Sequence, residues 1–284
     1  MLLNRGVNMN KNKQKRIAVI NDLSGFGRCS LTVALPIISA MKIQCCPLPT
    51  AILSANTAFP NFFFDDYTNK MENFTNHWKE LNLNFDGICT GFLGSKNQID
   101  IVIDFIKKFK DNNTHILVDP IMGDNGKIYS TYTDEMCNEM KLLIKYADII
   151  TPNLTEACKL IDMPYPNRTL NEKELEFIAK SLCENGPKKI VITGLQNNNY
   201  VQNYIYEIGK SPKIISVKKV GKDRCGTGDV FSSILAADMV NNLDIIASVK
   251  KASDFISKCL EFTSELDISV HEGICFEEYL CELK

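Results

Sequence analysis

Short apolar runs alternate with longer segments of helical spacing along most of this chain. The apolar runs predict strands at 16–21, 43–48, 85–90, 115–118, 148–150 and 189–193. The longer segments predict helices at 31–41, 69–81, 98–110, 133–146, 170–184, 243–262 and 274–283, and a hairpin is expected from 200–208 and 213–217. Repeated βα units imply a mainly parallel sheet with right-handed crossovers, and helices cover both faces of such a sheet. The sequence therefore predicts an α/β fold with a central, mostly parallel sheet flanked by helices.

The composition is that of an ordinary globular protein with one folded unit. Of the 284 residues, 45% are hydrophobic and 23% are charged, so a sizeable core is available. There is no internal repeat, low-complexity linker or break in composition, and we expect a single domain over 16–284. Residues 1–15 are rich in Asn and Lys and are predicted to form a flexible tail, with Met9 as an alternative start to Met1.

Charge and cysteine content narrow the classes of partner. The net charge of −2 without a long basic run gives no reason to expect nucleic acid, and it favours a small-molecule partner. The eleven cysteines are scattered and form no Cys-x-x-Cys motif, so reduced, mostly buried thiols are expected. A secretory signal and a membrane-length apolar run are both missing from the sequence, which predicts a soluble, cytoplasmic protein.

Residues 222–233 join a turn-forming sequence to a segment of helical spacing. Gly226 and Gly228 let the backbone approach an anion closely, and a helix is expected to start near Thr227. The free N–H groups at a helix start stabilise negative charge on a transferring phosphoryl group. Asp229 would repel a resting phosphate there, so a role as the base that accepts a hydroxyl proton is favoured. One alternative stays open, because an acidic residue in a first turn also suits the helix dipole alone.

Polar turns follow the predicted strands, at the edge of a parallel sheet where ligands bind. Asn21, Asp22 and Ser24 follow the first strand, and a mixed polar segment at 50–57 follows the second. An aromatic stretch at 59–67 is interpreted as a flap over a ring-shaped substrate, with core packing as the alternative for each phenylalanine.

Three carboxylates come from two later loops. Asp119 and Asp124 lie in one loop region and Glu156 in the next, and all are expected at the same edge of the sheet. Carboxylates in such an arrangement hold Mg²⁺, usually through water, beside nucleotide phosphates. Glu156 has an alternative role as an ordinary acid in the first turn of a helix.

The ordered set of motifs resembles the ribokinase-like superfamily, and within it the pyridoxal and pyridoxamine kinases of vitamin B6 salvage. The similarity runs from Arg16 to about Val240 and rests on five segments in order, 49–57, 90–95, 119–123, 151–156 and 226–229. Several motifs in the right order are more specific than any one of them. The resemblance implies a three-layer α/β/α fold, ATP and Mg²⁺ as cofactors, and a homodimer, and it leaves a K⁺ requirement open.

The resemblance also implies roles for individual residues. Asp229 would be the base for the 5′-hydroxymethyl group of the vitamer, and Gly226, Thr227 and Gly228 would form the anion hole. The substrate would contact Asp22, Ser24, Thr50 and Phe92. The nucleotide and its magnesium would be served by Asp119, Asp124, Tyr129, Thr151, Asn153, Glu156 and Thr193, with Asp119 and Glu156 nearest the metal.

Two positions depart from the pattern of the better-known pyridoxal kinases. Asp22 stands where a serine bonds the ring, and a carboxylate could pair with a protonated pyridine nitrogen or with an amine. Phe92 stands where tyrosine is frequent, so the stacking face is kept and the hydroxyl is lost. The preferred B6 vitamer therefore stays open.

Two other functions remain as alternatives to an ATP-dependent kinase of pyridoxal, pyridoxamine or pyridoxine. A kinase of hydroxymethylpyrimidine or its phosphate would share the fold and the anion hole, although in that family the position of Asp229 is frequently cysteine. A catalytically silent B6-binding protein is the remote alternative, and the intact Asp229 speaks against it. Sugar kinases of the same superfamily fit less well, because Phe92 and the aromatic stretch suit a flat ring.

Overall fold

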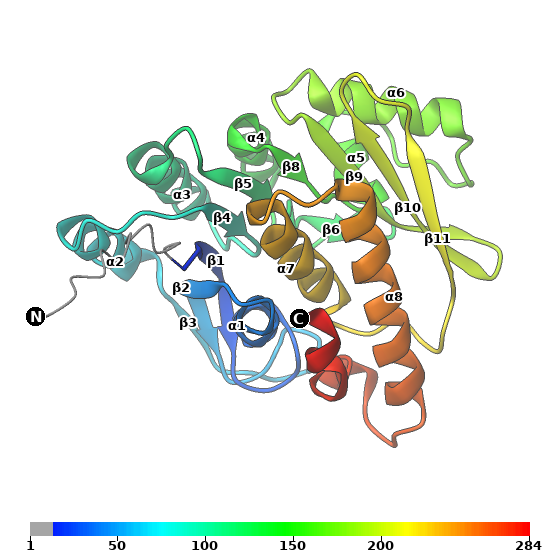
Figure 1. Ribbon diagram of the computed structural model, residues 1–284, viewed down its shortest axis with the longest axis horizontal. Helices are drawn as coiled ribbons and strands as arrows, with labels where there is room; N and C mark the ends of the chain where they lie inside the picture. The colour runs from blue at the N-terminus through cyan, green and yellow to red at the C-terminus, as the bar shows by residue number, and fades with distance from the viewer. Residues whose placement is uncertain (1–13) are drawn as a thin grey trace, which may run out of the picture.

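A nine-stranded sheet forms the middle layer of the protein (Figure 1). The computed structural model describes residues 14–284, so most of the tail predicted at 1–15 lies outside the described residues. The strand order is β11-β10-β9-β8-β5-β4-β1-β2-β3, and the six strands from β9 to β2 run parallel, with β3 and β10 antiparallel to their neighbours. The strands are β1 (Arg16–Ser24), β2 (Gln44–Leu53), β3 (Phe64–Asp66), β4 (Gly87–Thr90), β5 (His115–Val118), β8 (Ile149–Ile150), β9 (Lys189–Asn197), β10 (Tyr200–Glu207) and β11 (Lys213–Lys218).

Helices cover both faces of the sheet, which confirms the predicted three-layer architecture (Figure 1). One layer contains α2 (Thr68–Glu80), α3 (Lys96–Phe109), α4 (Asp134–Leu143), α5 (Leu154–Leu160) and α6 (Glu172–Cys183). The other contains α1 (Ser30–Ala40), α7 (Thr227–Val240) and α8 (Ile245–Ser264). The chain after α8 forms two short 3₁₀ helices, η2 (Val270–Glu272) and η3 (Glu277–Leu283), where the sequence predicted one helix at 274–283.

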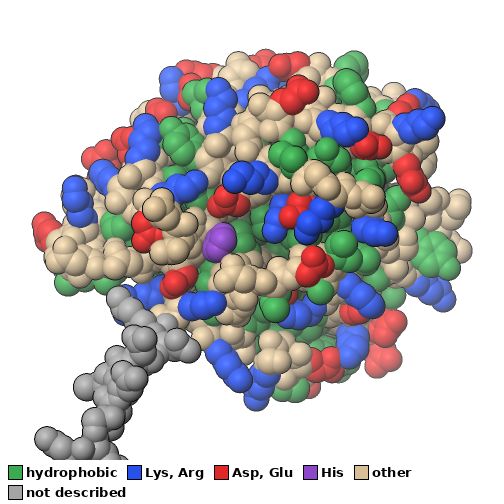
Figure 2. All heavy atoms as spheres, turned by 45° about the horizontal axis from the view of Figure 1, so that its top comes forward, with side chains coloured by type: hydrophobic (Ala, Val, Ile, Leu, Met, Phe, Trp, Pro, Cys, Tyr) green, Lys and Arg blue, Asp and Glu red, His purple; other side chains and the backbone are tan. Residues whose placement is uncertain are grey.

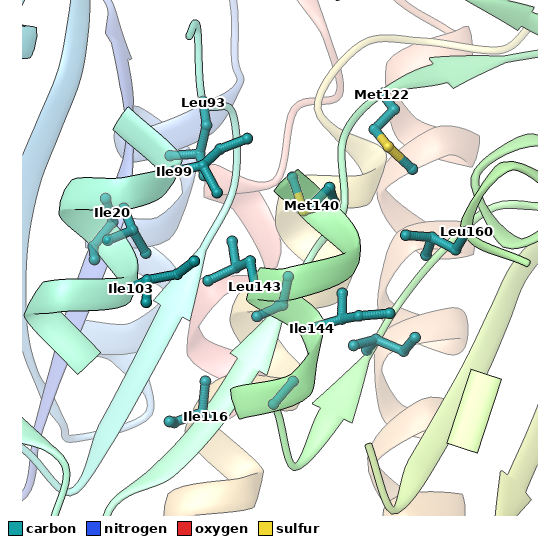
Figure 3. Packing of buried hydrophobic residues seen from close by; sticks show 14 of the residues in the cluster. Ile20, Leu93, Ile99, Ile103, Ile116, Met122, Met140, Leu143, Ile144 and Leu160 are labelled. Atoms are coloured by element: carbon teal, nitrogen blue, oxygen red, sulfur yellow. The ribbon is translucent and has the colours of Figure 1, made fainter. Parts of the chain in front are cut away.

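Alternation along β1 shows how one strand serves two cores. Ile17 and Val19 pack with α1, α7 and α8, whereas Ala18 and Ile20 pack with the layer that contains α3 and α4. Figure 3 shows the second of these cores between the sheet and the helices. Each fully buried aliphatic side chain contributes about 1.5–3 kcal/mol, so these two cores fix the positions of the strand ends.

The second strand is longer than the sequence predicted, because two prolines obscure it. Residues 43–48 were expected as strand and the following residues as loop, but β2 continues to Leu53 and pairs with β1 over most of its length. Pro47 and Pro49 are two residues apart, so their nitrogens point to the same side of the strand. On the outer side β3 pairs only with Ala51–Leu53, so the strand tolerates the two missing donors.

The strand order reverses at β1. The chain passes from β1 to β2 on one side and later places β4 on the other side. In open α/β sheets, ligands bind outside the carboxyl ends of the strands at such a switch point. The loops after β1, β4, β5 and β8 therefore meet there.

The remaining surface and sequence features agree with a globular protein of mixed charge. On the face shown in Figure 2, acidic and basic side chains are interspersed. None of the helices within residues 14–284 is long and apolar enough to cross a membrane. All eleven cysteines lie in the described residues, none forms a disulfide, and six are buried. Lys15, assigned to the tail from the sequence, donates from Nζ to the carbonyl of Val240 at 2.7 Å.

Candidate active site

The start of α7 has the backbone geometry of an anion site. Gly226 caps the helix with φ +78°, and a Cβ added there would lie 1.9 Å from the carbonyl oxygen of Arg28. The helix begins at Thr227, as predicted, and the first N–H groups of a helix have no intrahelical partner. A Cβ added at Gly228 would meet no atom within 4 Å, so the space beside this turn is open.

Asp229 lies in the first turn of α7 and is half-buried. Asn21 Nδ2 donates to its Oδ1 at 3.1 Å, and the backbone N–H of Ser30 also faces its carboxyl group. Burial, together with the nearby Asp22 carboxylate, raises the pKa of Asp229 to about 6, although Ser30 and Asn21 act in the opposite direction. Asp229 is therefore ionised at neutral pH yet is a stronger proton acceptor than an ordinary aspartate.

Asn21 connects three parts of the site. Its Oδ1 accepts from the backbone N–H of Phe92 at 2.8 Å and from that of Asp22 at 2.9 Å, while its Nδ2 holds Asp229. A Cβ at Gly91 would lie 2.3 Å from Asn21 Nδ2, so the chain after β4 packs directly on this side chain. The sequence placed Asn21 at the ligand-binding edge but assigned it no role. A polar residue ending an apolar strand was the available signal.

The residues predicted to contact the substrate lie at different depths. Asp22, Ser24 and Thr50 are buried, whereas Phe92 is half-buried. Thr50 Oγ1 donates to the carbonyl of Phe92 at 3.0 Å, and Ser24 Oγ donates to Asp22 Oδ2 at 2.8 Å. Phe92 is thus the member of this group that has exposed surface on which a substrate ring could stack. The other three are buried and bond to protein groups.

Two of the three predicted metal-site carboxylates come together. Asp119 follows β5, and burial, assisted by the charge of Asp229, raises its pKa to about 8. Glu156 is buried near it, and burial and the charge of Asp119 raise the pKa of Glu156 well above its usual range. The oxygens of Glu156 accept from the backbone N–H groups of Met122 at 3.1 Å and Asn153 at 2.8 Å. Glu156 therefore also forms the capping box of α5. This agrees with the alternative prediction that it is an ordinary acid in the first turn of a helix.

The surroundings of Asp119 fit a hydrated magnesium ion. The hydroxyl of Thr151 is near enough to lower the pKa of Asp119, yet this buried oxygen has no partner with hydrogen-bond geometry among residues 14–284. An unsatisfied buried hydroxyl beside a carboxylate can bond a metal-bound water. No group of three or more metal-ligating side chains occurs within the described residues. Mg²⁺ is commonly held by one or two carboxylates together with substrate phosphates and water, so the donor set is compatible with it.

Asp124 stands apart from these two carboxylates. It lies on the small exposed hairpin of β6 (Gly123–Asp124) and β7 (Lys127–Ile128), where its oxygens accept from the backbone and side chain of Asn125. The hairpin is fastened to α5, because Asn153 Nδ2 donates to the carbonyl of Gly123 at 2.7 Å.

Tyr129 and Thr193 border the predicted nucleotide side. Tyr129 is 45% exposed, and burial of its remainder, with the charge of Glu156, raises the pKa of its hydroxyl to about 12. Thr193 is half-buried and pairs with Asn153 in an isolated parallel bridge. Both residues therefore lie beside the hairpin and the start of α5.

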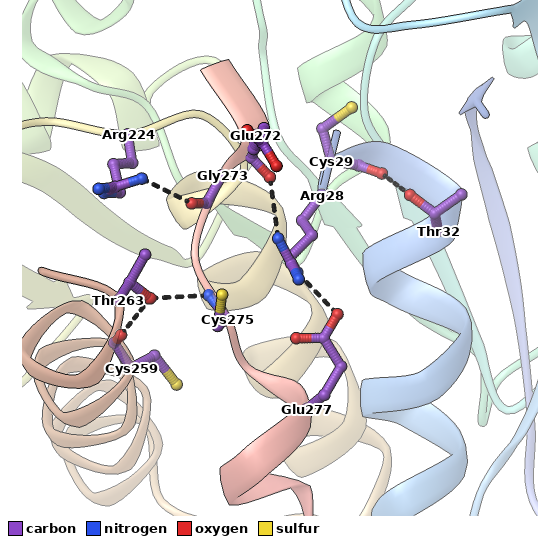
Figure 4. A network of polar contacts seen from close by, with 10 residues as sticks. All are labelled: Arg28, Cys29, Thr32, Arg224, Cys259, Thr263, Glu272, Gly273, Cys275 and Glu277. Carbon is purple, nitrogen blue, oxygen red and sulfur yellow. Dashed lines mark hydrogen bonds and ion pairs between the residues drawn. The ribbon is translucent and has the colours of Figure 1, made fainter. Parts of the chain in front are cut away.

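A segment near the C-terminus supports the glycine turn before α7. Arg28 donates from its backbone N–H to the carbonyl of Glu272 at 3.0 Å and from Nε to Glu277 at 2.7 Å. Arg224 donates to the carbonyl of Gly273 at 3.4 Å, and Figure 4 shows the two arginines reaching this segment from either side. No local pattern in the sequence indicates this support, because its partners are far apart along the chain.

Replacing Asp119 by asparagine is expected to stabilise the ligand-free protein at pH 8. The carboxyl group has a pKa of about 8 in the folded protein and a usual value of 3.8. The folded state therefore holds a proton that the unfolded chain releases, and this contribution to stability is lost as pH rises from about 4 to about 8. We expect Tm of Asp119→Asn to exceed that of the wild type by about 2 °C or more at pH 8 in calorimetry, with a smaller gain at pH 5. A lower Tm at pH 8 would contradict the assigned burial cost.

Comparison with known proteins places the chain in a family. The family model described as phosphomethylpyrimidine kinase matches residues 35–274. The chain belongs to this family. A solved structure from Bacteroides thetaiotaomicron, provisionally described as a phosphomethylpyrimidine kinase, is 39% identical with a TM-score of 0.94, covering 97% of this chain and 96% of its own. Another crystal form of that protein is described as containing pyridoxal.

Other relatives include kinases of both substrate classes. The pyridoxal kinase of Staphylococcus aureus, described in complex with AMP-PCP and pyridoxal, shares the fold with a TM-score of 0.75 at 17% identity, covering 88% of each chain. The chain spans about half the length of two curated relatives. It is 23% identical to the thiamine biosynthetic bifunctional enzyme TH1 of Arabidopsis thaliana, over 89% of this chain and 47% of that one. It is 30% identical to a provisionally described pyridoxal kinase of Caenorhabditis elegans, over 59% of this chain and 53% of that one. These relatives thus include proteins described as pyridoxal kinases and as a phosphomethylpyrimidine kinase.

Proposed function

We propose that the protein transfers the γ-phosphoryl group of ATP to the 5′-hydroxymethyl group of a B6 vitamer. The observation that carries this proposal is a carboxylate with a pKa of about 6, held by Asn21 in the first turn of the helix whose free N–H groups follow Gly226. A proton acceptor beside an anion site is what attack by an alcohol on a phosphoryl group requires.

In the proposed mechanism, this chain's residues position the reactants and move one proton. Asp229 accepts the proton of the hydroxymethyl group while the hydroxymethyl oxygen attacks the γ-phosphorus in line. The bond between the γ-phosphorus and the β,γ-bridging oxygen breaks, and ADP leaves. The N–H groups of Gly226, Thr227 and Gly228 stabilise the charge that develops on the phosphoryl oxygens. Asp119, with Glu156 behind it, would hold Mg²⁺ through water, and the ion would neutralise charge on the nucleotide phosphates.

Further residues complete the proposed substrate and nucleotide sites. Phe92 would stack on the pyridine ring, with Thr50 fixing the loop that carries it. The nucleotide would lie along the edge formed by Tyr129, Thr151 and Asn153, with Thr193 and Asp124 at its border. Asp22 and Ser24 would lie beneath the acceptor-binding part of the site. The cytoplasmic location stays a prediction from the sequence, the homodimer stays one from the resemblance, and a K⁺ requirement stays open.

Two lines of support favour a B6 vitamer as the acceptor. The Bacteroides relative, 39% identical over nearly the whole chain, has a crystal form described with pyridoxal. Asp229 retains a carboxylate at the position that is frequently cysteine in hydroxymethylpyrimidine kinases. The family description and the thiamine enzyme of Arabidopsis favour hydroxymethylpyrimidine or its phosphate as the second candidate. A silent binding protein is disfavoured by the intact base.

An acceptor panel tests the proposal. Purified protein with ATP and Mg²⁺ is assayed for ADP formation with pyridoxal, pyridoxamine, pyridoxine and hydroxymethylpyrimidine, and kcat/KM is compared. We expect at least one B6 vitamer to exceed hydroxymethylpyrimidine by about tenfold or more, which corresponds to about 1.4 kcal/mol of transition-state discrimination. A preference for hydroxymethylpyrimidine would identify it, and not a B6 vitamer, as the acceptor. Inactivity with all four acceptors would reject the proposed kinase activity.

The pH dependence of kcat/KM should report the base. Only the ionised Asp229 can accept a proton, and its pKa is raised to about 6, chiefly by burial. We expect kcat/KM to be level above that pH and to fall about tenfold per pH unit below it. An acid limb that begins near pH 4 would mean that the burial of Asp229 does not govern the base.

A further inference from the structure

Ser30 occupies an unusual backbone conformation at the edge of the site. It is the first residue of α1 and has φ +53°, in the left-handed region that disfavours residues with a side chain. It is also buried, and its N–H faces the carboxyl group of Asp229. A strained residue that touches the proposed base calls for a specific cause.

Asp22 supplies the contact that holds Ser30. Ser30 Oγ donates to Asp22 Oδ1 at 2.6 Å, and Ser24 Oγ donates to Asp22 Oδ2 at 2.8 Å, so each oxygen of this buried carboxylate has a hydroxyl partner. The backbone N–H of Asp22 is in turn fixed by Asn21 Oδ1 at 2.9 Å. The two consecutive polar side chains of β1 thus contact the first turns of two helices, Asn21 that of α7 and Asp22 that of α1.

Two consecutive residues of β1 thus act on Asp229. Asn21 contacts it directly, and Asp22 reaches it through Ser30. We propose that Asp22 and Ser30 are positioning residues, in which the Asp22 carboxylate holds Ser30 in the left-handed conformation so that the Ser30 N–H fixes Asp229 toward the anion hole. This inference rests on the proposed function, and it gives the buried Asp22 a task that does not involve contact with the vitamer.

A pair of substitutions at one position tests the role of the backbone. Ser30→Ala removes the hydroxyl but keeps the penalty of the left-handed conformation, so we expect kcat to fall about tenfold or more with KM for ATP and acceptor within about twofold. Ser30→Gly also lacks the hydroxyl, but glycine adopts this conformation without help. Ser30→Gly should therefore regain most of the turnover lost in Ser30→Ala. Equal losses in the two variants would overturn the proposal.

A double-mutant cycle tests whether Asp22 acts through Ser30. At pH 8, well above the pKa of Asp229, Asp22→Ala should lower kcat as much as Ser30→Ala does, and equally for pyridoxal and pyridoxamine. The same substitution in the Ser30→Gly background should change kcat less than about threefold. A full effect in that background, or a changed ratio between the two vitamers, would instead assign Asp22 to direct substrate contact.

A measurement without substrate separates this inference from the proposed function. Amide hydrogen exchange of Ser30 in the ligand-free protein should be at least about tenfold faster in Asp22→Ala than in the wild type, since Ser30 would no longer be held with its N–H toward the Asp229 carboxyl group. The exchange of amides in α8 serves as the internal control and should not change. Unchanged exchange at Ser30 would reject the positioning role, whereas an inactive wild type with the expected exchange pattern would reject only the kinase reaction.

Discussion

Asp229→Ala is expected to lower kcat by about 10²- to 10⁴-fold, because it removes a general base that is already close to the anion hole. The side chain is held by Asn21 Nδ2 at 3.1 Å, and its pKa of about 6 makes it a competent proton acceptor at neutral pH. Affinity for a non-hydrolysable ATP analogue should largely survive, because the N–H groups at the start of α7 remain in place. Steady-state kinetics and calorimetric binding measure the two effects separately.

Asp229→Asn is the matched control for shape. Its side chain has the same size and keeps an oxygen for the Asn21 amide, but it cannot accept the hydroxyl proton. We expect its kcat to be as low as that of the alanine variant, with Tm nearer to the wild type. If either variant retained turnover within a few-fold of the wild type, Asp229 would not be the base.

Gly226→Ala is expected to abolish most activity and to destabilise the fold. The added Cβ would meet the Arg28 carbonyl oxygen at 1.9 Å, and φ of +78° is disfavoured for alanine by about 1–2 kcal/mol before any clash. The turn must then move, and the displaced N–H groups should cost about 10²- to 10³-fold in kcat. We expect Tm to fall by about 4 °C or more.

Gly228→Ala separates the anion hole from the fold. Nothing lies within 4 Å of a Cβ at Gly228, and no left-handed conformation is needed there, so Tm should stay within about 2 °C of the wild type. The open space is where the phosphoryl group would lie, so kcat should still fall by about tenfold or more. Thermal denaturation and kinetics of both variants test this. Wild-type Tm and turnover in Gly226→Ala would contradict the observed turn, and wild-type turnover in Gly228→Ala would place the phosphoryl group elsewhere.

The sequence predicted those features that depend on local pattern. Alternating apolar runs and helical segments gave the parallel sheet and its layers, and glycine spacing gave the start of α7 at Thr227. The carboxylates Asp119 and Glu156 were expected at one edge because parallel strands end there together, and they do lie close to each other. Local spacing and a common strand direction suffice for these predictions.

Features that depend on long-range contacts could not be predicted from the sequence pattern. Asn21 and Asp229 are far apart in the chain but are joined by a hydrogen bond, and the left-handed conformation of Ser30 has no signature in its residue type. Asp22 was expected to face the ligand, and its placement beneath two hydroxyls follows only from where β1 and α1 pack. That Asp22 contacts a vitamer stays a prediction, which the cycle with Ser30 tests.

Mass spectrometry of the acceptor after reaction with ATP tests whether the protein phosphorylates a B6 vitamer with Asp229 as the base. The purified protein is incubated with Mg²⁺, ATP and pyridoxal, and both the acceptor and the nucleotide products are identified. We expect one phosphoryl group on the 5′ oxygen of pyridoxal for each ADP formed, and none with Asp229→Ala over the same time. ADP and free phosphate without a phosphorylated acceptor, or phosphorylation that persists in Asp229→Ala at the wild-type rate, would contradict it.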